Sequence, residues 1–277
     1  MRAKKSFGQH FLTNESIAAH IAGSLSAIGE PEAAEGTARV LEVGPGKGML
    51  TKYLLEQRLD LKVVEADHDM VAYLEDNYPE LDGRIIAEDF LQLDLAQVFP
   101  SSGSASGPPH PFLLIGNFPY NISSQIVFKM VENRQLVPQM VGMFQKEMAE
   151  RIIAPPGGKD YGVISVLVQA FYEGEYLFSV GNQNFNPPPK VQSGVIRLTR
   201  RATPPACDEA LFRQIVKTAF GQRRKMLRNT LKPFFPDPAV LEGDFFKKRP
   251  ETLSVETFLE LTERVAASSG HVAQNPQ

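Results

Sequence analysis

The sequence has little cysteine. Cys207 stands alone among 277 residues, which excludes an internal disulfide and a CxxC pair for zinc. The histidines at positions 10, 20, 68, 110 and 271 show no metal-ligand spacing, so we expect no metal site. Long hydrophobic runs are also missing, since no stretch approaches the roughly 20 apolar residues that span a membrane. The first residues, MRAKKSFGQHFL, lack the apolar stretch of a signal peptide, and we therefore expect a cytoplasmic protein with no membrane partner.

Acidic residues are absent from one window of the chain. The net charge is −3, yet residues 211–232 contain seven basic side chains and no acidic one. This asymmetry predicts a localised positive surface that contacts phosphates of a nucleic acid, although a solvated helix face is the alternative interpretation. The residues of the window that we expect to bind nucleic acid are Arg223, Arg224, Lys225 and Arg228.

Short β-branched runs alternate with amphipathic segments through the first 200 residues. The expected strands are 39–44, 61–67, 84–89, 112–117 and 139–145. The segments between them carry apolar residues at steps of three and four, which is typical of helices. Repeated strand and helix predict an α/β fold with a mostly parallel sheet covered on both faces. After a helix at 161–173, the runs 176–180 and 194–198 predict an antiparallel edge.

A change of composition marks the domain boundary. The segment RRATPPACDE, residues 200–209, has the composition of a linker, and the basic window follows it. We therefore predict a first domain at 1–200 and a smaller α-helical domain at 201–277 with a frayed tail. Within 211–232 the apolar residues share one helical face, and Gly221 is expected to end one helical segment before a second begins.

Three strand ends carry groups that suit parts of an adenosine. The motif LEVGPGKG places Gly44 and Gly46 between a strand and a helix, where glycines permit a tight turn and close approach to a ligand. Glu65 ends the next strand and suits two ribose hydroxyls. The third run ends in Glu88 and Asp89, where a carboxylate can accept a hydrogen bond from the adenine amine. Ordinary turns and surface carboxylates are the alternative interpretation.

An adenosine cofactor without phosphates fits this pattern best. A dinucleotide requires neutralised phosphates or an open helix N-terminus, whereas Pro45 places a rigid imide in the loop where a dinucleotide site normally has a flexible residue. We therefore expect S-adenosylmethionine as the cofactor.

The stretch LLIGNFPYNISS, residues 113–124, ends an apolar run in Asn117, Phe118, Pro119 and Tyr120. An aromatic amine is a poor nucleophile because its lone pair is delocalised into the ring. Two acceptors, Asn117 Oδ1 and the Phe118 carbonyl, would favour the pyramidal amine and aim it at a methyl sulfonium, so no strong general base is required. Pro119 fixes the turn, and Tyr120 offers a ring for stacking on the base. A turn without catalytic role is the alternative.

A rigid loop follows much later in the chain. In NFNPPPKV, residues 184–191, Phe185 precedes three prolines and is expected to face Tyr120, so that an extruded base lies between two rings. Lys190 of the same loop joins the expected RNA-binding residues. The alternative is a rigid connector with Phe185 in the core.

Taken together, these motifs resemble one family, the KsgA-type 16S ribosomal RNA adenine dimethyltransferases. The resemblance runs from about Lys5 to Leu231 and rests on the motifs above together with KSFGQHFL, EDFLQLDL, FQKEMAERI, DYGVISVLVQAFY and AFGQRRKMLRNTL. It implies a Rossmann-like class I methyltransferase domain followed by a helical domain. The cofactor contacts that it implies are Gln9, His10, Leu12, Gly44, Gly46, Glu65, Asp89 and Asn117.

The resemblance also implies a reaction and a partner. Two adjacent adenosines near the 3′ end of 16S rRNA would become N6,N6-dimethyladenosine, in an immature small ribosomal subunit. Separately, we expect the protein to be a monomer. The chain departs from the family at His10, where Asn is usual, at Gln192, where Asp is usual, and at Phe118, where Leu is commoner. Three alternatives stay open: a 23S rRNA methyltransferase of the macrolide-resistance type, a DNA adenine methyltransferase, and a ribosome-assembly factor without catalysis.

Overall fold

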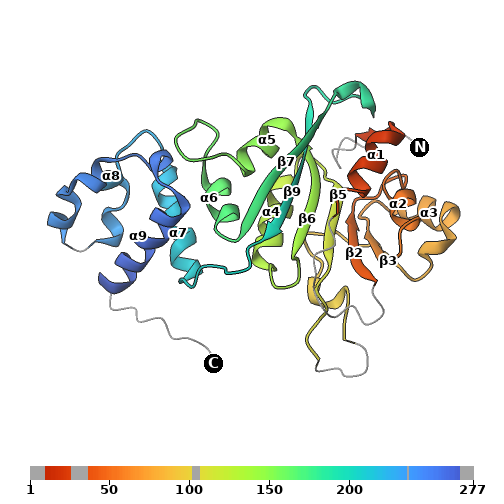
Figure 1. The fold of residues 1–277 in the computed structure, drawn as a ribbon, viewed down its shortest axis with the longest axis horizontal. Helices are drawn as coiled ribbons and strands as arrows, with labels where there is room; N and C mark the ends of the chain where they lie inside the picture. Colours follow the sequence, from red (N-terminus) through yellow and green to blue (C-terminus); the bar gives the residue numbers. More distant parts are fainter. Residues whose placement is uncertain (1–9, 26–36, 102–106, 236, 269–277) are drawn as a thin grey trace. The chain divides into compact units, whose positions relative to one another are not determined.

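The computed structural model describes residues 10–25, 37–101, 107–235 and 237–268. The chain forms two compact units, which are residues 1–149 with 173–200, and residues 150–172 with 201–277 (Figure 1). One edge of the division falls at Arg200, where the sequence analysis places it. The segment 150–172 differs from the expectation, because it belongs to the second unit and not to the first.

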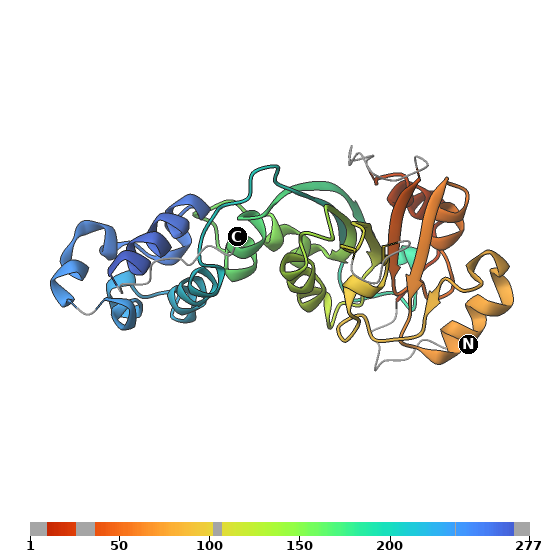
Figure 2. The same cartoon turned by 90° about the horizontal axis from the view of Figure 1, so that it is seen from below.

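The described part of the first unit is built on a seven-stranded sheet with the order β4-β3-β2-β5-β6-β9-β7. The strands are β2 (Ala38–Val43), β3 (Leu59–Val64), β4 (Ile85–Ile86), β5 (Leu113–Asn117), β6 (Gln139–Gln145), β7 (Tyr172–Val180) and β9 (Ser193–Arg200). The first five run parallel, and β9 pairs antiparallel with β6, from Gln139 opposite Thr199 to Gln145 opposite Ser193. Two views show β2 and β3 side by side (Figures 1 and 2). The predicted fold class, a mostly parallel sheet with an antiparallel edge, is confirmed.

One face of this sheet packs against three helices, α1 (Glu15–Ala22), α2 (Thr51–Leu55) and α3 (His68–Asn77). Alternate strand residues and the apolar sides of these helices form one buried cluster, which includes Val40, Leu61, Val63, Ile115, Val141, Ile21, Leu54 and Leu74. Since neighbouring strand residues point to opposite faces, Leu41 and Leu114 lie on the other face. Burial on both faces explains why the central strands β5 and β6 are almost continuous apolar runs.

The helix α4 (Ser123–Glu132) follows β5 after a short turn. Its residues Ile126, Val127 and Met130 recur at steps of one and three, and all are fully buried. This spacing gives one apolar stripe, so α4 packs along the sheet and leaves its other side to solvent. The turn before it carries the NFPY motif, and β5 therefore delivers this motif to the carboxyl edge of the parallel strands.

The second unit is helical in its described part. It contains α6 (Val163–Gln169), α7 (Glu209–Gly221), α8 (Leu227–Thr230) and α9 (Val255–Ser268), while α5 (Lys146–Ile152) enters it from the first unit. The ring of Phe220 contacts those of Tyr161 and Phe258, which ties the segment before α6 to α7 and α9. This aromatic packing is why 150–172 joins the second unit. Gly221 ends α7, as expected, but the helix expected at 161–173 stops at Gln169 because β7 begins at Tyr172.

Candidate functional site

A cavity of about 510 Å³ opens at the carboxyl edge of the parallel strands. It lies where β2, β3 and β5 end, and the segment 10–13 closes another side. The predicted site residues that line it are His10, Leu12, Gly44, Gly46, Glu65, Asp89, Asn117, Phe118, Pro119 and Tyr120. Gln9 lies outside the described residues. The structure thus brings together residues that are separated by more than 100 positions in the sequence.

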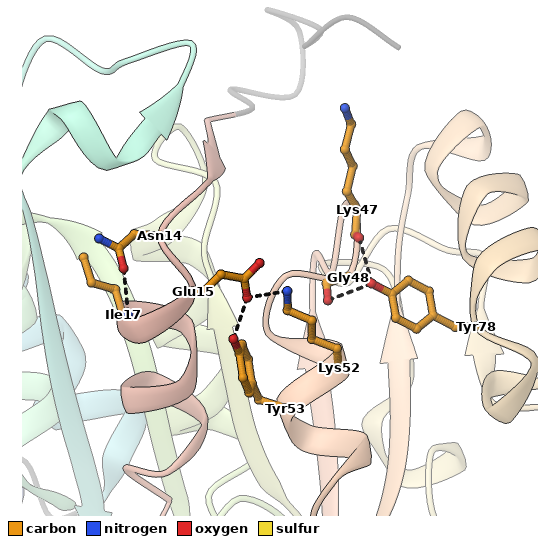
Figure 3. A network of polar contacts seen from close by, with 8 residues as sticks. All are labelled: Asn14, Glu15, Ile17, Lys47, Gly48, Lys52, Tyr53 and Tyr78. Atoms are coloured by element: carbon orange, nitrogen blue, oxygen red, sulfur yellow. Dashed lines mark hydrogen bonds and ion pairs between the residues drawn. The ribbon is translucent and has the colours of Figure 1, made fainter.

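The glycine loop is shaped by its neighbours. Gly44 and Gly46 have φ values of 69° and 55°, which side chains rarely adopt. A Cβ on Gly46 would lie 3.1 Å from the Phe11 ring, so the absent side chain lets the N-terminal segment close over the loop. At Gly48 a Cβ would lie 2.4 Å from the Tyr78 ring, whose hydroxyl lies 3.2 Å and 3.1 Å from the carbonyls of Lys47 and Gly48 (Figure 3). The packing and the hydrogen bonds of Tyr78 therefore fix the backbone conformation of the glycine loop.

Glu65 sits directly after β3 and is only 8% exposed. Its carboxylate accepts hydrogen bonds from the backbone amides of Gly46, at 3.1 Å, and Asp67, at 3.0 Å. Burial raises the pKa of Glu65, and the two amides partly offset that effect. The carboxylate is consequently fixed in position with lone pairs available to hydroxyl groups of a ligand.

The third strand end forms another wall of the cavity. Asp89 lies beyond β4 and accepts a hydrogen bond from the Leu91 amide through Oδ1, at 2.9 Å, which leaves its second oxygen for a ligand. Phe90, which the sequence analysis missed, is buried and lines the cavity beside it. An apolar residue directly after an acidic pair at a strand end was the available signal. A carboxylate next to an aromatic ring suits a purine base with an amine.

The NFPY motif presents its polar groups to the cavity. Asn117 Nδ2 donates a hydrogen bond to the His10 carbonyl at 3.1 Å. Because that carbonyl can only accept, it orients the amide and leaves Oδ1 as the free acceptor. The Phe118 side chain is fully buried against the Phe144 ring, with centroids 5.1 Å apart, so only its backbone can serve a substrate. Asn117 Oδ1 therefore faces the cavity as an acceptor, and the catalytic roles of Asn117 and Phe118 stay predictions.

Aromatic rings line the same wall. Tyr120 is held by Ser193, with 2.6 Å between Oη and Oγ, and burial raises the pKa of its hydroxyl while the Ser193 hydrogen bond acts in the opposite direction. The imidazole of His10 stacks on the Tyr120 ring, with centroids 5.5 Å apart. His10 Nδ1 donates to the Pro187 carbonyl at 2.9 Å, which fixes the imidazole against the triple-proline loop.

The N-terminal segment is anchored at both ends. β1 (Phe11–Leu12) pairs antiparallel with β8 (Phe185–Asn186). Beyond it, the carboxylate of Glu15 contacts both Lys52 and Tyr53 of α2, so that α1 is tied to the helix behind the glycine loop (Figure 3). The segment therefore spans the cavity between two fixed points.

The prediction for Phe185 is wrong in this structure. Its ring is 4% exposed and belongs to the hydrophobic cluster that packs under α1, so it cannot stack on a base. The antiparallel pairing of Leu12 with Phe185 turns the ring inward, and the alternative of a core residue holds. Asn186, the next residue, points the other way and lines the cavity instead. Lys190 is exposed.

The predicted RNA-binding residues of the second unit lie mainly in a turn and not along a helix. Arg224 and Lys225 are exposed between α7 and α8, and Arg228 lies on α8. Arg223 is engaged within the unit, because its guanidinium donates to the carbonyls of Lys159 and Gly158. The structure therefore gives Arg223 a structural role, which is to hold the 158–159 loop.

One buried acid in the cavity wall was not predicted as a site residue. Glu42 is 1% exposed, and Thr51 Oγ1 donates to its Oε2 at 2.7 Å. Burial raises the pKa of Glu42 to about 8, and the nearby carboxylate of Glu65 acts in the same direction. Glu42 is therefore largely protonated below that pH.

The ranges that the structure describes contain neither a metal-binding cluster nor a membrane-spanning helix. No group of three or more His, Cys, Asp or Glu side chains there is arranged to hold a metal ion. None of the helices in those ranges is both long and apolar enough to cross a membrane.

Known proteins are similar to this chain over nearly its whole length. The family model described as ribosomal RNA adenine dimethylase matches residues 1–264. The chain is 50% identical over 267 residues to ribosomal RNA small subunit methyltransferase A of Bacteroides fragilis, with 96% of this chain and 93% of the relative covered. It is 51% identical over 270 residues to the protein of that name in Flavobacterium johnsoniae, with 96% and 97% covered.

Two solved structures have the same fold as this chain. A dimethyladenosine transferase from Plasmodium falciparum is 25% identical, with a TM-score of 0.75 and with 94% of this chain and 98% of that chain covered. The 23S rRNA methyltransferase ErmE is 26% identical, with a TM-score of 0.64 and with 92% and 99% covered.

Proposed function

The chain belongs to the ribosomal RNA adenine dimethylase family, and from this membership we propose how its site works and which RNA it modifies. The protein is an rRNA adenine N6,N6-dimethyltransferase that uses S-adenosylmethionine. Its substrate is ribosomal RNA. The mechanism and residue roles below are our proposal.

The residues of the cavity fit S-adenosylmethionine, which supplies a methyl group activated by its sulfonium. The volume of about 510 Å³ lies in the range of sites for ligands of this size. Glu65 would accept the ribose hydroxyls, the free oxygen of Asp89 would accept the adenine amine, and Phe90 would pack on the purine. Gly44 and Gly46 would let the backbone approach the methionine part, and His10 and Leu12 would cover it. Gln9 remains an expected contact.

Asn117 and the Phe118 carbonyl would activate the target amine. Each would accept one N–H of the adenosine, which favours a pyramidal nitrogen with its lone pair directed into the cavity. The single observation that carries this role is the bond from Asn117 Nδ2 to the His10 carbonyl, because it leaves Oδ1 as an acceptor beside the cofactor cavity. Tyr120, stacked on His10 and held by Ser193, would receive the face of the base. The surplus proton would leave to solvent after transfer.

Two adjacent adenosines near the 3′ end of 16S rRNA are the proposed targets. The identity of about 50% to small-subunit methyltransferases supports this choice over the 23S enzymes, of which ErmE is 26% identical. We also propose that the enzyme acts as a monomer, in the cytoplasm, on an immature small subunit. Phosphates of that RNA would be bound by Arg224, Lys225, Arg228 and Lys190, which are basic and lie at least partly on the surface.

The exchange Asn117→Ala tests the mechanism. We expect transfer of labelled methyl groups to small subunits that lack the modification to fall by about 10²–10³, because a preorganised polar contact to the reacting group is lost. The affinity for S-adenosylhomocysteine should change less than about threefold, since Asp89 and Glu65 remain. Asn121→Ala is the matched control, because Asn121 lines the same cavity outside the proposed contacts.

Equal incorporation by the Asn117→Ala enzyme would remove the proposed role of Asn117. Cofactor binding without any transfer by the wild type would favour a ribosome-assembly factor. Mass spectrometry of the modified nucleosides distinguishes the small from the large subunit, and offering duplex DNA as a competitor tests the DNA alternative.

A further inference from the structure

A lysine of α4 holds the strand-end segment 89–93 from the side away from the cavity. Lys129 Nζ donates to the carbonyl of Leu91 at 2.9 Å and to that of Leu93 at 2.6 Å. The same ammonium lies 5.4 Å from the centroid of the Phe90 ring. Asp89 and Phe90 line the cofactor cavity, whereas Lys129 lines a separate hollow together with Leu91 and Leu93.

The segment closes on itself through Asp89. The Asp89 carbonyl accepts hydrogen bonds from the amides of Gln92, at 2.9 Å, and Leu93, at 3.1 Å, while its side chain accepts from Leu91. In these hydrogen bonds the backbone amides of the segment are the donors. The hydrogen bonds from Lys129 are accepted by the carbonyls of the same segment. The two hydrogen bonds of Lys129 thus tie this turn to α4.

Several carboxylates near Lys129 favour the charged form of its side-chain amine. Burial lowers the pKa of Lys129, but the carboxylates of Asp89, Glu88, Asp94 and Glu132 act in the opposite direction. An ammonium that donates to two carbonyls in a partly buried place makes stronger hydrogen bonds than a neutral donor. α4 begins at Ser123, three residues after Tyr120, so the same helix follows the methyl-transfer motif.

We propose that Lys129 is a positioning residue that sets the adenine end of the cofactor site and fixes it to the helix that follows the NFPY motif. This inference rests on the proposed function, because it takes Asp89 and Phe90 as adenine contacts. Lys129 touches neither cofactor nor substrate. Its loss would let the segment 89–93 relax, which weakens cofactor binding equally in the ground state and in the transition state.

The exchange Lys129→Met keeps the aliphatic stem and removes the charged donor. We expect the Kd for S-adenosylhomocysteine, measured by titration calorimetry, and the KM for S-adenosylmethionine to rise about tenfold, as for the loss of one charged hydrogen bond. The kcat at saturating cofactor should stay within about twofold, and the KM for small subunits should not change. Lys129→Arg retains a cationic donor and should restore cofactor affinity to within about threefold.

Lys62→Met is the matched control. Lys62 Nζ donates to the Val98 carbonyl at 2.7 Å and lies 5.0 Å from the centroid of the Phe99 ring, and neither partner lines the cavity. The control removes the same kind of link at a distance from the site. Unchanged cofactor affinity in Lys62→Met, beside the loss in Lys129→Met, would support the proposal.

Three results would overturn the proposal: equal affinities of wild type and Lys129→Met, an equal loss in Lys62→Met, or a fall in kcat with an unchanged KM for the cofactor. If Lys129→Met does not fold, Lys129→Gln replaces it, with weak binding expected, and Lys129→Arg remains the tight reference. A wild type that binds no S-adenosylhomocysteine would instead refute the proposed function. Normal binding by the wild type with no effect at position 129 refutes only the role of Lys129.

Discussion

Replacing Glu42 by Gln should remove much of the pH dependence of the stability of the first unit. Glu42 lies under the glycine loop, where Thr51 Oγ1 donates to its carboxyl group and water has almost no access. Burial raises its pKa from the ordinary 4.5 to about 8, so the folded protein binds this proton more tightly than the unfolded chain does. The stability that Glu42 contributes is therefore fully present below pH 4.5 and is lost as the pH rises through about 8.

The size of the effect follows from the same values. Since each pKa unit corresponds to about 1.4 kcal/mol, the free energy of unfolding should fall by on the order of 4 kcal/mol between about pH 5 and pH 9 through this group. Gln keeps an oxygen for Thr51 and stays neutral, so the variant mimics protonated Glu42. We expect the variant to lie within about 1 kcal/mol of wild type near pH 5, and to exceed wild type by on the order of 3 kcal/mol at pH 9.

Urea unfolding across this pH range, followed by circular dichroism, measures the effect. The midpoint of the transition of the first unit is compared at constant m value, because a change in m would indicate altered compactness. Glu15→Gln is the control: the hydrogen bond from Lys52 lowers the pKa of Glu15 below 4.5, so its contribution is lost only below this pH range, and its curve should run parallel to that of wild type from pH 5 to 9. Parallel curves for wild type and Glu42→Gln from pH 5 to 9 would show that Glu42 is not held protonated.

The remaining predictions concern the glycine loop and the basic turn. Gly48→Ala should destabilise the protein by about 3 kcal/mol, because a Cβ meets the Tyr78 ring at 2.4 Å, whereas Gly83→Ala, with a similar φ of 67° and open space, should cost about 1 kcal/mol in the same thermal melts. Equal costs would contradict the steric argument. A triple Ala variant should weaken RNA binding and lower the slope of log K against log salt by roughly 2–3, with unchanged cofactor affinity. It exchanges Arg224, Lys225 and Arg228. Arg223→Ala should mainly lower the melting temperature, because it loses its hydrogen bonds to the 158–159 loop. Weaker RNA binding with an unchanged melting temperature would contradict this.

Much of the first unit could be predicted from local patterns. A strand buried on both faces is mostly apolar, and the runs that end at Val43, Val64 and Asn117 are apolar enough at their ends to be found, although charged residues such as Glu42 and Lys62 interrupt them. Since parallel strands end at one edge of a sheet, polar residues directly after such runs had to meet in space. The glycine loop, Glu65 and Asn117 were found in this way, although each lies on a different strand.

The wrong predictions share a physical cause, because each depends on a contact between distant segments. The direction of the Phe185 ring is decided by the pairing of Phe185 with Leu12, which is far away in the sequence. The local sequence, an aromatic residue before three prolines, does not show whether the ring faces a base or the core. The segment 150–172 joins the second unit because Tyr161 meets Phe220. Lys129 was not predicted, because its hydrogen-bond partners are backbone carbonyls, which the residue types do not identify.

At position 10, where the resemblance implies Asn, the proposed activation of the target amine does not depend on the side chain. The contact that orients Asn117 is made by the backbone carbonyl of His10, which every residue possesses, so the exchange of Asn for His does not disturb the acceptor Oδ1. The imidazole has a separate use, because it donates to Pro187 and stacks on Tyr120. A ring in place of an amide enlarges the apolar wall that receives the base. The exchange at position 10 should therefore alter how firmly the target adenine is held and leave the activation of its amine to Asn117.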